Sequence, residues 1–214
     1  MRPRAGLREI APGAVHLPDW LPLSEQARLA AAFAEWSCGP VPPRAASLPN
    51  GGRMSVETVC LGWHWLPYRY TRTADDVNGR RVLPFPDWLG DLARGAVEEA
   101  CGAATAYRPD AALANYYRPD ARMGMHQDKE ERAADPVVSF SVGDSCVFRF
   151  GNVEGRGQPY TDVRLGSGDA FVFGGPARFA YHGVPKLFPN TAPAGCGLDR
   201  GRINITVRVT GLRD

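Results

Sequence analysis

Three residues in the second half of the chain have the types and spacing of a metal site. His126 and Asp128 stand two residues apart, and His182 follows the apolar run AFVF. Side chains at positions i and i+2 of an extended backbone point to the same face. Two histidines and one carboxylate form the facial triad by which non-haem oxygenases bind iron(II) and leave coordination positions open. We therefore predict that these three residues are the metal ligands and the catalytic centre, although H-x-D also arises by chance.

The last predicted strand offers a site for an anion. The run RINITVRV alternates strictly between polar and apolar residues, which predicts a half-buried strand at 202–209. Its polar face carries Arg202, Asn204, Thr206 and Arg208. This face spans about 20 Å at 3.3 Å per residue, and two guanidinium groups on it could bind a small dicarboxylate. The alternative is an edge strand with a solvated polar face.

A second pair of polar residues supports the dicarboxylate site. Asn115 and Tyr117 have the same i, i+2 spacing and lie just upstream of His126. Their amide and phenol groups can hydrogen-bond a carboxylate.

Helices precede strands along the chain. Helical periodicity predicts helices at 24–36, with Ser24 as the N-cap, and at 85–101. Proline and glycine crowd residues 39–52, which indicates a loop. From about residue 112, short β-rich runs take over. We expect an α+β, mainly β fold, in which helices pack against an antiparallel jelly roll.

Composition places the chain among globular proteins. It has 214 residues, 44% hydrophobic and 22% charged, with a formal net charge of +2. The near balance of charge means that any surface for nucleic acid must be a local patch. The five cysteines lack C-x-x-C spacing, which favours a reducing compartment, and no apolar run reaches membrane-spanning length. We expect a cytoplasmic protein with no membrane association.

Three stretches carry a family resemblance. The sequences NYYRPDARMGMHQDKEE, FGGPARFAYHG and RINITVR occur in this order and resemble the AlkB family of nucleic-acid dealkylating dioxygenases. The resemblance implies a double-stranded β-helix, or jelly roll, with N-terminal helices packed on one sheet. It further implies iron(II) bound by the triad and 2-oxoglutarate bound by Asn115, Tyr117, Arg202, Asn204 and Arg208.

The same resemblance divides the chain into an N-terminal extension and helix (1–48), a nucleotide-recognition lid (49–84) and a jelly-roll core (85–214), together one structural domain. In the lid, Trp63 aligns with a base-stacking tryptophan, while Trp65 and Tyr70 are expected to pack in the core or in a hairpin. The remaining substrate contacts that the resemblance implies are Met54, Ser55, Tyr68, Arg69 and Glu130.

The implied reaction is oxidative repair of N-alkylated bases. Bases such as 1-methyladenine and 3-methylcytosine, in DNA or RNA, would be restored with dioxygen as oxidant, while 2-oxoglutarate becomes succinate and carbon dioxide and formaldehyde is released. Glu130 would favour cationic adducts. We expect a monomer that acts preferentially on single-stranded nucleic acid. Two alternatives remain: a 2-oxoglutarate dioxygenase with another kind of substrate, and a metal-containing nucleic-acid-binding module without turnover.

Overall fold

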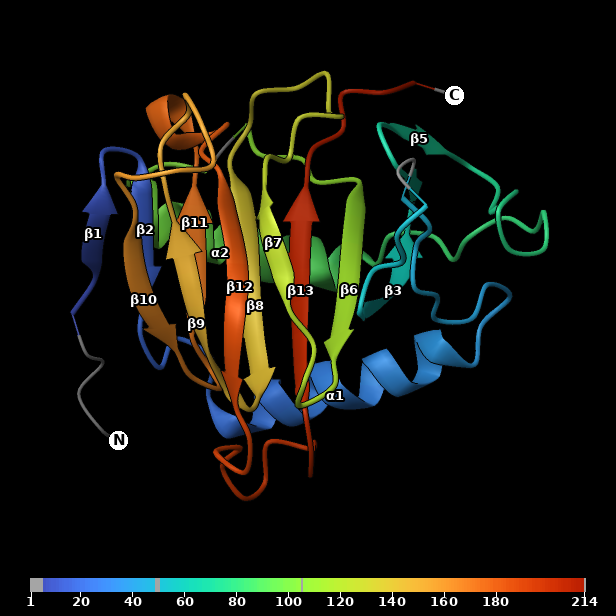
Figure 1. Ribbon diagram of the computed structural model, residues 1–214, viewed down its shortest axis with the longest axis horizontal. Coiled ribbons are helices and arrows are strands. Elements are labelled where there is room, and N and C mark those ends of the chain that lie inside the picture. Colours follow the sequence, from blue (N-terminus) through green and yellow to red (C-terminus); the bar gives the residue numbers. More distant parts are fainter. Residues whose placement is uncertain (1–5, 49–50, 105, 214) are drawn as a thin grey trace.

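The computed structural model describes residues 6–48, 51–104 and 106–213, which form a mainly β structure with two long helices. The larger sheet has seven strands in the order β1-β2-β11-β8-β13-β6-β3 (Figure 1). These strands are β1 (Arg8–Ala11), β2 (Ala14–Leu17), β3 (Val56–Leu61), β6 (Ala111–Tyr117), β8 (Val137–Gly143), β11 (Ala170–Phe173) and β13 (Arg202–Arg208). The predicted last strand is thus the fifth of seven and not an edge.

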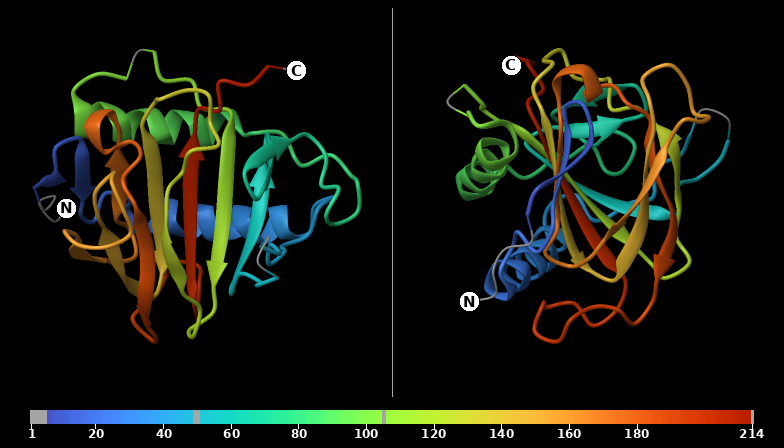
Figure 2. Two further views of the ribbon diagram at one scale, coloured as in Figure 1. Left: turned by 45° about the horizontal axis from the view of Figure 1, so that its top comes forward. Right: turned by 90° about the vertical axis from the view of Figure 1, so that its left-hand side faces the viewer.

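A four-stranded sheet faces the large one. Its order is β10-β9-β12-β7, and its strands are β7 (Met123–His126), β9 (Ser145–Phe150), β10 (Thr161–Leu165) and β12 (His182–Phe188). Apolar side chains from both sheets, among them Phe148, Phe171 and Val184, fill the space between them. Figure 2 (right) shows the two sheets from the side. This arrangement is consistent with the predicted jelly roll.

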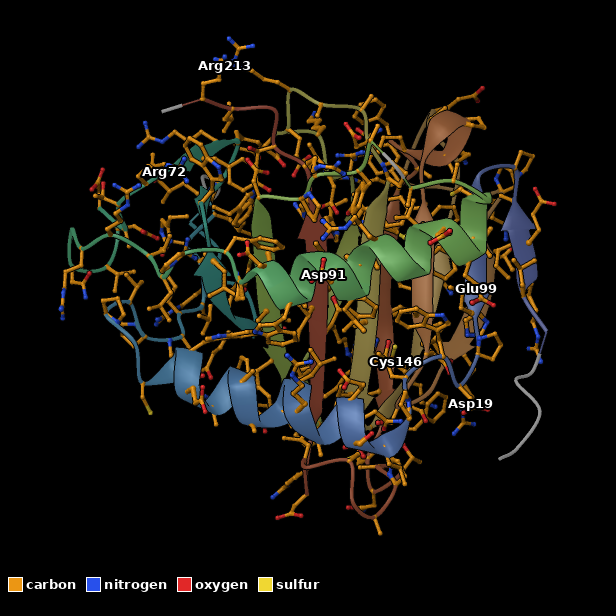
Figure 3. The ribbon with its side chains drawn as sticks, turned by 180° about the vertical axis from the view of Figure 1, so that it is seen from behind. Asp19, Arg72, Asp91, Glu99, Cys146 and Arg213 are labelled. Atoms are coloured by element: carbon orange, nitrogen blue, oxygen red, sulfur yellow. The ribbon has the colours of Figure 1, made fainter. Side chains whose placement is uncertain are left out.

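Two helices lie on the outer side of the large sheet. They are α1 (Leu23–Ser37) and α2 (Asp87–Cys101), and both cross in front of the strands in Figure 3, which views the molecule from behind and labels Asp91 on α2. Leu29 of α1 and Leu89 of α2 belong to the same buried cluster as Ile205 of β13. Burial of apolar surface, at about 25 cal/mol per Å², is what holds these layers together.

The lid segment is described from residue 51 onward and has a small apolar core of its own. Its two-stranded sheet consists of β4 (His64–Leu66) and β5 (Arg69–Thr71), where Trp65 faces Tyr70 across the hairpin. Both rings pack against a cluster that includes Cys60 of β3 and Leu113 of β6. The packing role expected for these two aromatic residues is confirmed.

A charge cluster ties the lid to the preceding loop. His64 Nε2 donates to Asp76 Oδ1 at 2.6 Å, and Arg44 Nε lies 2.7 Å from Asp76 Oδ2. Arg44 also donates to the Trp65 carbonyl. The Asp76 carboxylate therefore links the loop before β3 to strand β4 of the lid.

Several local expectations differ from the structure. The first helix begins at Leu23 after Pro22 and has no side-chain cap, so the predicted N-cap at Ser24 is wrong. The chain after His182 is strand β12, which carries residues 182–188 away from the metal ligands, and only then does the loop to β13 begin. That loop is anchored by Asp144, which accepts from the backbone of Thr191 and Gly201.

Neither helix of the described residues is long and apolar enough to cross a membrane. All five cysteines are free, and Cys60, Cys146 and Cys196 are buried.

Candidate metal centre and cosubstrate pocket

His126, Asp128 and His182 converge at one end of the barrel. His126 ends β7 and His182 begins β12, and the two residues are paired in the antiparallel ladder. Asp128 follows two residues later, so its side chain lies on the same side as that of His126. One ligand atom from each residue lies within 4.8 Å of the others. The carboxylate oxygens are 3.7 Å from His126 Nε2 and 3.6 Å from His182 Nε2.

Hydrogen bonds fix how the two imidazoles present their nitrogens. His126 Nδ1 lies 2.9 Å from the Gly124 carbonyl and His182 Nδ1 lies 3.0 Å from the Ala180 carbonyl. A carbonyl only accepts, so each Nδ1 carries the proton and each Nε2 keeps its lone pair toward the carboxylate. Second-shell bonds of this kind orient metal-ligating histidines.

The electrostatics of the triad suit a cation. Burial lowers the pKa of His182 to about 4, and neighbouring His126 adds to the effect, so its ring is neutral at pH 7. Burial alone would raise the pKa of the Asp128 carboxyl, but the Arg208 guanidinium and the two imidazoles outweigh it and lower the pKa. A neutral imidazole and an ionised carboxylate are the protonation states in which these groups bind a metal.

The chain around His182 is closely packed. The His182 ring lies 5.0 Å from the Phe173 ring and 5.8 Å from the Phe148 ring, measured between centroids. At Gly183, a Cβ atom would stand 2.7 Å from the Met123 carbonyl oxygen of β7. Glycine at this position therefore lets β12 approach β7 closely enough for the two histidines to meet.

A polar pocket extends from the triad between the two sheets. The polar face of β13 lines it, while Ile203, Ile205 and Val207 face the helices. In the ladder, Arg202 is opposite Tyr117 and Asn204 is opposite Asn115. The five residues predicted to bind 2-oxoglutarate all line this pocket: Asn115, Tyr117, Arg202, Asn204 and Arg208.

The inner end of the pocket is marked by a buried guanidinium with free donors. Arg202 is 1% exposed and gives one hydrogen bond, from Nη2 to Ser141 Oγ at 2.8 Å. Its Nε and Nη1 atoms have no partner. A buried charged donor without a partner costs free energy unless a ligand satisfies it. The site is therefore suited to a carboxylate.

Arg208 stands at the other end, beside the triad. Its Nη2 atom lies 2.9 Å from Asp128 Oδ2, a charge contact outside hydrogen-bond geometry that leaves Oδ2 without a hydrogen-bond donor. Its Nη1 atom donates to Glu131 Oε1 and to the Tyr70 hydroxyl, each at 3.0 Å. Both arginine side chains therefore line one pocket, although their backbone positions lie about 20 Å apart along β13.

The donor set fits iron(II) and 2-oxoglutarate. At the triad, the buried Asp128 carboxylate has one oxygen that accepts no hydrogen bond, and the carboxylate lies beside the Nε2 atoms of both histidines, as binding of a divalent metal requires. Further along the pocket, the unpaired donors of Arg202 fit the distal carboxylate of a dicarboxylate.

Comparison with known proteins agrees with this interpretation of the site. The sequence profile of the 2OG-Fe(II) oxygenase superfamily matches residues 13–208. The alpha-ketoglutarate-dependent dioxygenase AlkB of Escherichia coli K12 is 34% identical over 180 residues, which cover 81% of this chain and 80% of that protein. The chain belongs to the AlkB family. Membership confirms the predicted class, an Fe(II)- and 2-oxoglutarate-dependent dioxygenase, and with it iron(II), 2-oxoglutarate and dioxygen.

Other relatives agree in sequence and in fold. The DNA N(6)-methyladenine demethylase ALKBH1D of Arabidopsis thaliana is 31% identical over 93% of this chain and 50% of that protein. The solved structure of OsALKBH1 is 30% identical and superposes with a TM-score of 0.85, covering 95% of this chain and 99% of that one. The chain spans about half the length of the Arabidopsis relatives that it matches.

Trp63, for which the AlkB resemblance predicts a base-stacking role, is buried in this structure. Trp63 is 6% exposed, its Nε1 atom donates to Asp110 Oδ2 at 3.1 Å, and the Arg72 guanidinium lies 3.5 Å from the ring centroid. The ring does not line the pocket around His126. Because Asp110 also accepts from Thr210, Trp63 joins the lid to the end of β13 and packs as a core residue.

Two other lid residues lie at the surface. Tyr68 is 70% exposed and has a φ of 71° at the turn between β4 and β5, and Arg69 next to it is also exposed. Both side chains are accessible to a partner in solution.

Glu130 follows the ligand Asp128 by two residues, and Ser55 contacts the segment before β7. Glu130 is half-buried, and burial, followed by the charges of Asp128 and Glu131, raises its pKa. Ser55 Oγ exchanges hydrogen bonds with the backbone of Arg122, just before β7, while Met54 donates its N–H to the Ala46 carbonyl.

Two buried residues beside the site were not predicted. Arg178 follows the short helix Gly175–Ala177 and donates to the carbonyls of Asp128 and Asp135 and to Glu131 Oε2. Glu131 in turn binds Arg208. Arg178 lies in the stretch GGPAR and Glu131 in the stretch DKEE. The two side chains meet only because the loop that carries Glu131 folds against Arg178.

Proposed function

We propose that this AlkB-family chain oxidatively removes alkyl groups from nucleobases such as 1-methyladenine and 3-methylcytosine in DNA or RNA. The observation that carries the proposal is the asymmetry of the metal ligands. The side chain of His126 is 35% exposed, whereas those of His182 and Asp128 are 8% and 5% exposed. A bulky planar substrate therefore has access to the centre over His126.

In this proposal the triad holds iron(II), and the polar pocket holds 2-oxoglutarate. Arg202 binds the carboxylate far from the metal and Arg208 the one near it, with Asn115, Tyr117 and Asn204 hydrogen-bonding along the pocket. When bound, iron with 2-oxoglutarate and dioxygen supplies an oxidant that hydroxylates the N-alkyl carbon, so that a methyl adduct is released as formaldehyde. The chain contributes positioning and exclusion of water, through Phe148 and Phe173 among others.

The surface around His126 would hold the nucleic acid. The lid, residues 49–84, presents Tyr68 and Arg69 to a flanking phosphate, and Met54 and Ser55 lie at the start of β3. Glu130 would favour bases that carry positive charge. Stacking of a flipped base on His126 would stabilise it by about 1–3 kcal/mol. The proposal includes single-stranded nucleic acid as the preferred form and a monomeric enzyme.

A second candidate substrate comes from the relatives. Two Arabidopsis proteins that match 93% of this chain are named DNA N(6)-methyladenine demethylases. We therefore include N6-methyladenine, a neutral adduct, as the rival to the cationic bases.

The test is a demethylation assay on defined single strands. Protein loaded with iron(II) and 2-oxoglutarate under anaerobic conditions would be exposed to air with oligonucleotides that contain 1-methyladenine, 3-methylcytosine or N6-methyladenine. Loss of the methyl group with formaldehyde release, abolished in His126→Ala, supports the proposal, and the ranking of the three bases identifies the substrate. Succinate formation without loss of any methyl group would overturn the nucleic-acid substrate.

A further inference from the structure

Glu131 is a buried carboxylate close to the triad with three side-chain partners. It lies in the loop between β7 and β8, and its side chain is 0% exposed. One oxygen, Oε1, accepts from the Tyr70 hydroxyl at 2.5 Å and from Arg208 Nη1 at 3.0 Å. The other, Oε2, accepts from Arg178 Nη2 at 2.9 Å. This carboxylate therefore joins three parts of the chain that are distant in sequence.

Arg178 holds the loop on which Glu131 stands. Its Nη1 donates to the Asp128 carbonyl at 2.6 Å and its Nε to the Asp135 carbonyl at 2.8 Å. The guanidinium is 1% exposed and so binds the loop at its start, its middle and its end. The planar fork of arginine can satisfy three acceptors at fixed angles, which a lysine cannot do.

Tyr70 reaches the same carboxylate from the lid. It lies in β5, and its ring packs with the small apolar core of the lid. Its hydroxyl donates to Glu131 and accepts from Arg208 Nη1 at 3.0 Å. Burial raises the pKa of Tyr70 well above its ordinary value, so the phenol stays protonated and keeps donating. The Tyr70 hydroxyl thus links the lid directly to Arg208, which lines the pocket.

We infer that Tyr70, Glu131 and Arg178 are positioning residues that hold the Arg208 guanidinium for the cosubstrate and make its orientation depend on the lid. The inference rests on the proposed binding of 2-oxoglutarate by Arg208. Charged hydrogen bonds in a buried site are strong and directional, so removing one partner changes where the other points. A lid that shifts when nucleic acid binds would then alter affinity for 2-oxoglutarate.

The test measures 2-oxoglutarate binding without turnover, by calorimetric titration of the manganese(II)-loaded protein. Tyr70→Phe keeps the ring and removes the hydroxyl, and we expect about three- to tenfold weaker binding. Glu131→Gln removes the charge, and we expect about tenfold weaker binding or more. Because Tyr70 and Glu131 bond each other and both accept from Arg208 Nη1, the loss of affinity in the double variant should be smaller than the sum of the two single losses.

Tyr107→Phe is the matched control. Its hydroxyl also bonds β13, at the Val207 carbonyl, but Tyr107 belongs to the apolar cluster on the helix side. We expect unchanged binding there. In turnover, Tyr70→Phe should raise KM for 2-oxoglutarate and leave kcat near the wild-type value.

The outcomes separate the inference from the proposal beneath it. If Arg208→Ala itself leaves 2-oxoglutarate affinity unchanged, the assignment of Arg208 to the cosubstrate fails. If Arg208→Ala weakens binding while Tyr70→Phe and Glu131→Gln do not, or if the two weaken it additively, the positioning network is wrong.

Discussion

Arg202 combines full burial with two donors that have no partner inside the protein, which makes it the residue with most to gain from a ligand. We expect Arg202→Ala to weaken 2-oxoglutarate binding by about tenfold or more, because a charge-assisted contact is lost. Titration of the manganese(II)-loaded protein would measure it. Arg200→Ala, an exposed arginine two residues earlier, is the control and should bind normally. Equal affinities in both variants would contradict the assignment.

Trp63 supports a different expectation, one about stability. A buried indole that bonds Asp110 and packs under Arg72 should cost about 3–5 kcal/mol of unfolding free energy when replaced by alanine. Denaturant unfolding of Trp63→Ala would measure this, with exposed Tyr68→Ala expected to lie within about 0.5 kcal/mol of wild type. A fully stable Trp63→Ala protein that no longer binds oligonucleotide would restore the stacking role.

Single functional residues could be predicted from the sequence where their spacing follows the local periodicity of the backbone. His126 with Asp128, and Arg202 with Arg208, are spaced by strand periodicity, so their shared faces follow from the backbone alone. Arg178 carries no such signal. Its partners come from a loop about fifty residues away, and only the closure of that loop creates them.

Among the elements, the lid depends on the protonation of His64. Burial lowers the pKa of His64 from 6.5, and Arg44 also opposes its charge, although Asp76 favours it. His64 is therefore protonated at a higher pH in the unfolded chain than in the folded one. Its contribution to the stability of the folded lid is fully present above about pH 6.5 and is lost as the pH falls below that value.

We expect hydrogen exchange in residues 62–78, corrected for intrinsic rates, to accelerate between pH 7.5 and pH 5.5 relative to the hairpin β9–β10. His64→Gln should remove the pH dependence. The same protection factors at both pH values in the wild type would show that His64 does not control the lid.

The sequence predicted those helices and strands whose residues follow a clear helical or alternating pattern. The helix expected at 85–101 is α2, Asp87–Cys101, and the runs expected as strands are β6, β8, β9, β11 and β13. Six strands were missed, namely β1, β2, β3, β7, β10 and β12. Of these, β1, β2 and β7 have only four residues, which give too little periodicity to recognise. Their pairing is decided by neighbours distant in sequence.

For the whole molecule, cofactor binding should appear as stability. A ligand at one hundred times its dissociation constant stabilises the folded state by about 2.7 kcal/mol. For a chain of this size, each kcal/mol raises Tm by about 2–4 °C. We therefore expect manganese(II) with 2-oxoglutarate to raise Tm by about 5–10 °C, measured by calorimetry. In His126→Ala the shift should largely disappear, and an equal shift there would place the binding elsewhere.

Both edges of the large sheet carry features that disfavour strand pairing between molecules. At one edge, the outermost strand is the short β1, which carries the charged residues Arg8 and Glu9. Strand β1 pairs with β2, and β2 pairs with β11. At the other edge, the backbone of Arg44 bonds Thr58 of β3. A variant that lacks β1 and β2 would keep every ligand of the metal centre. It would expose the unpaired backbone of β11, and an exposed edge strand of this kind promotes intermolecular strand addition and aggregation.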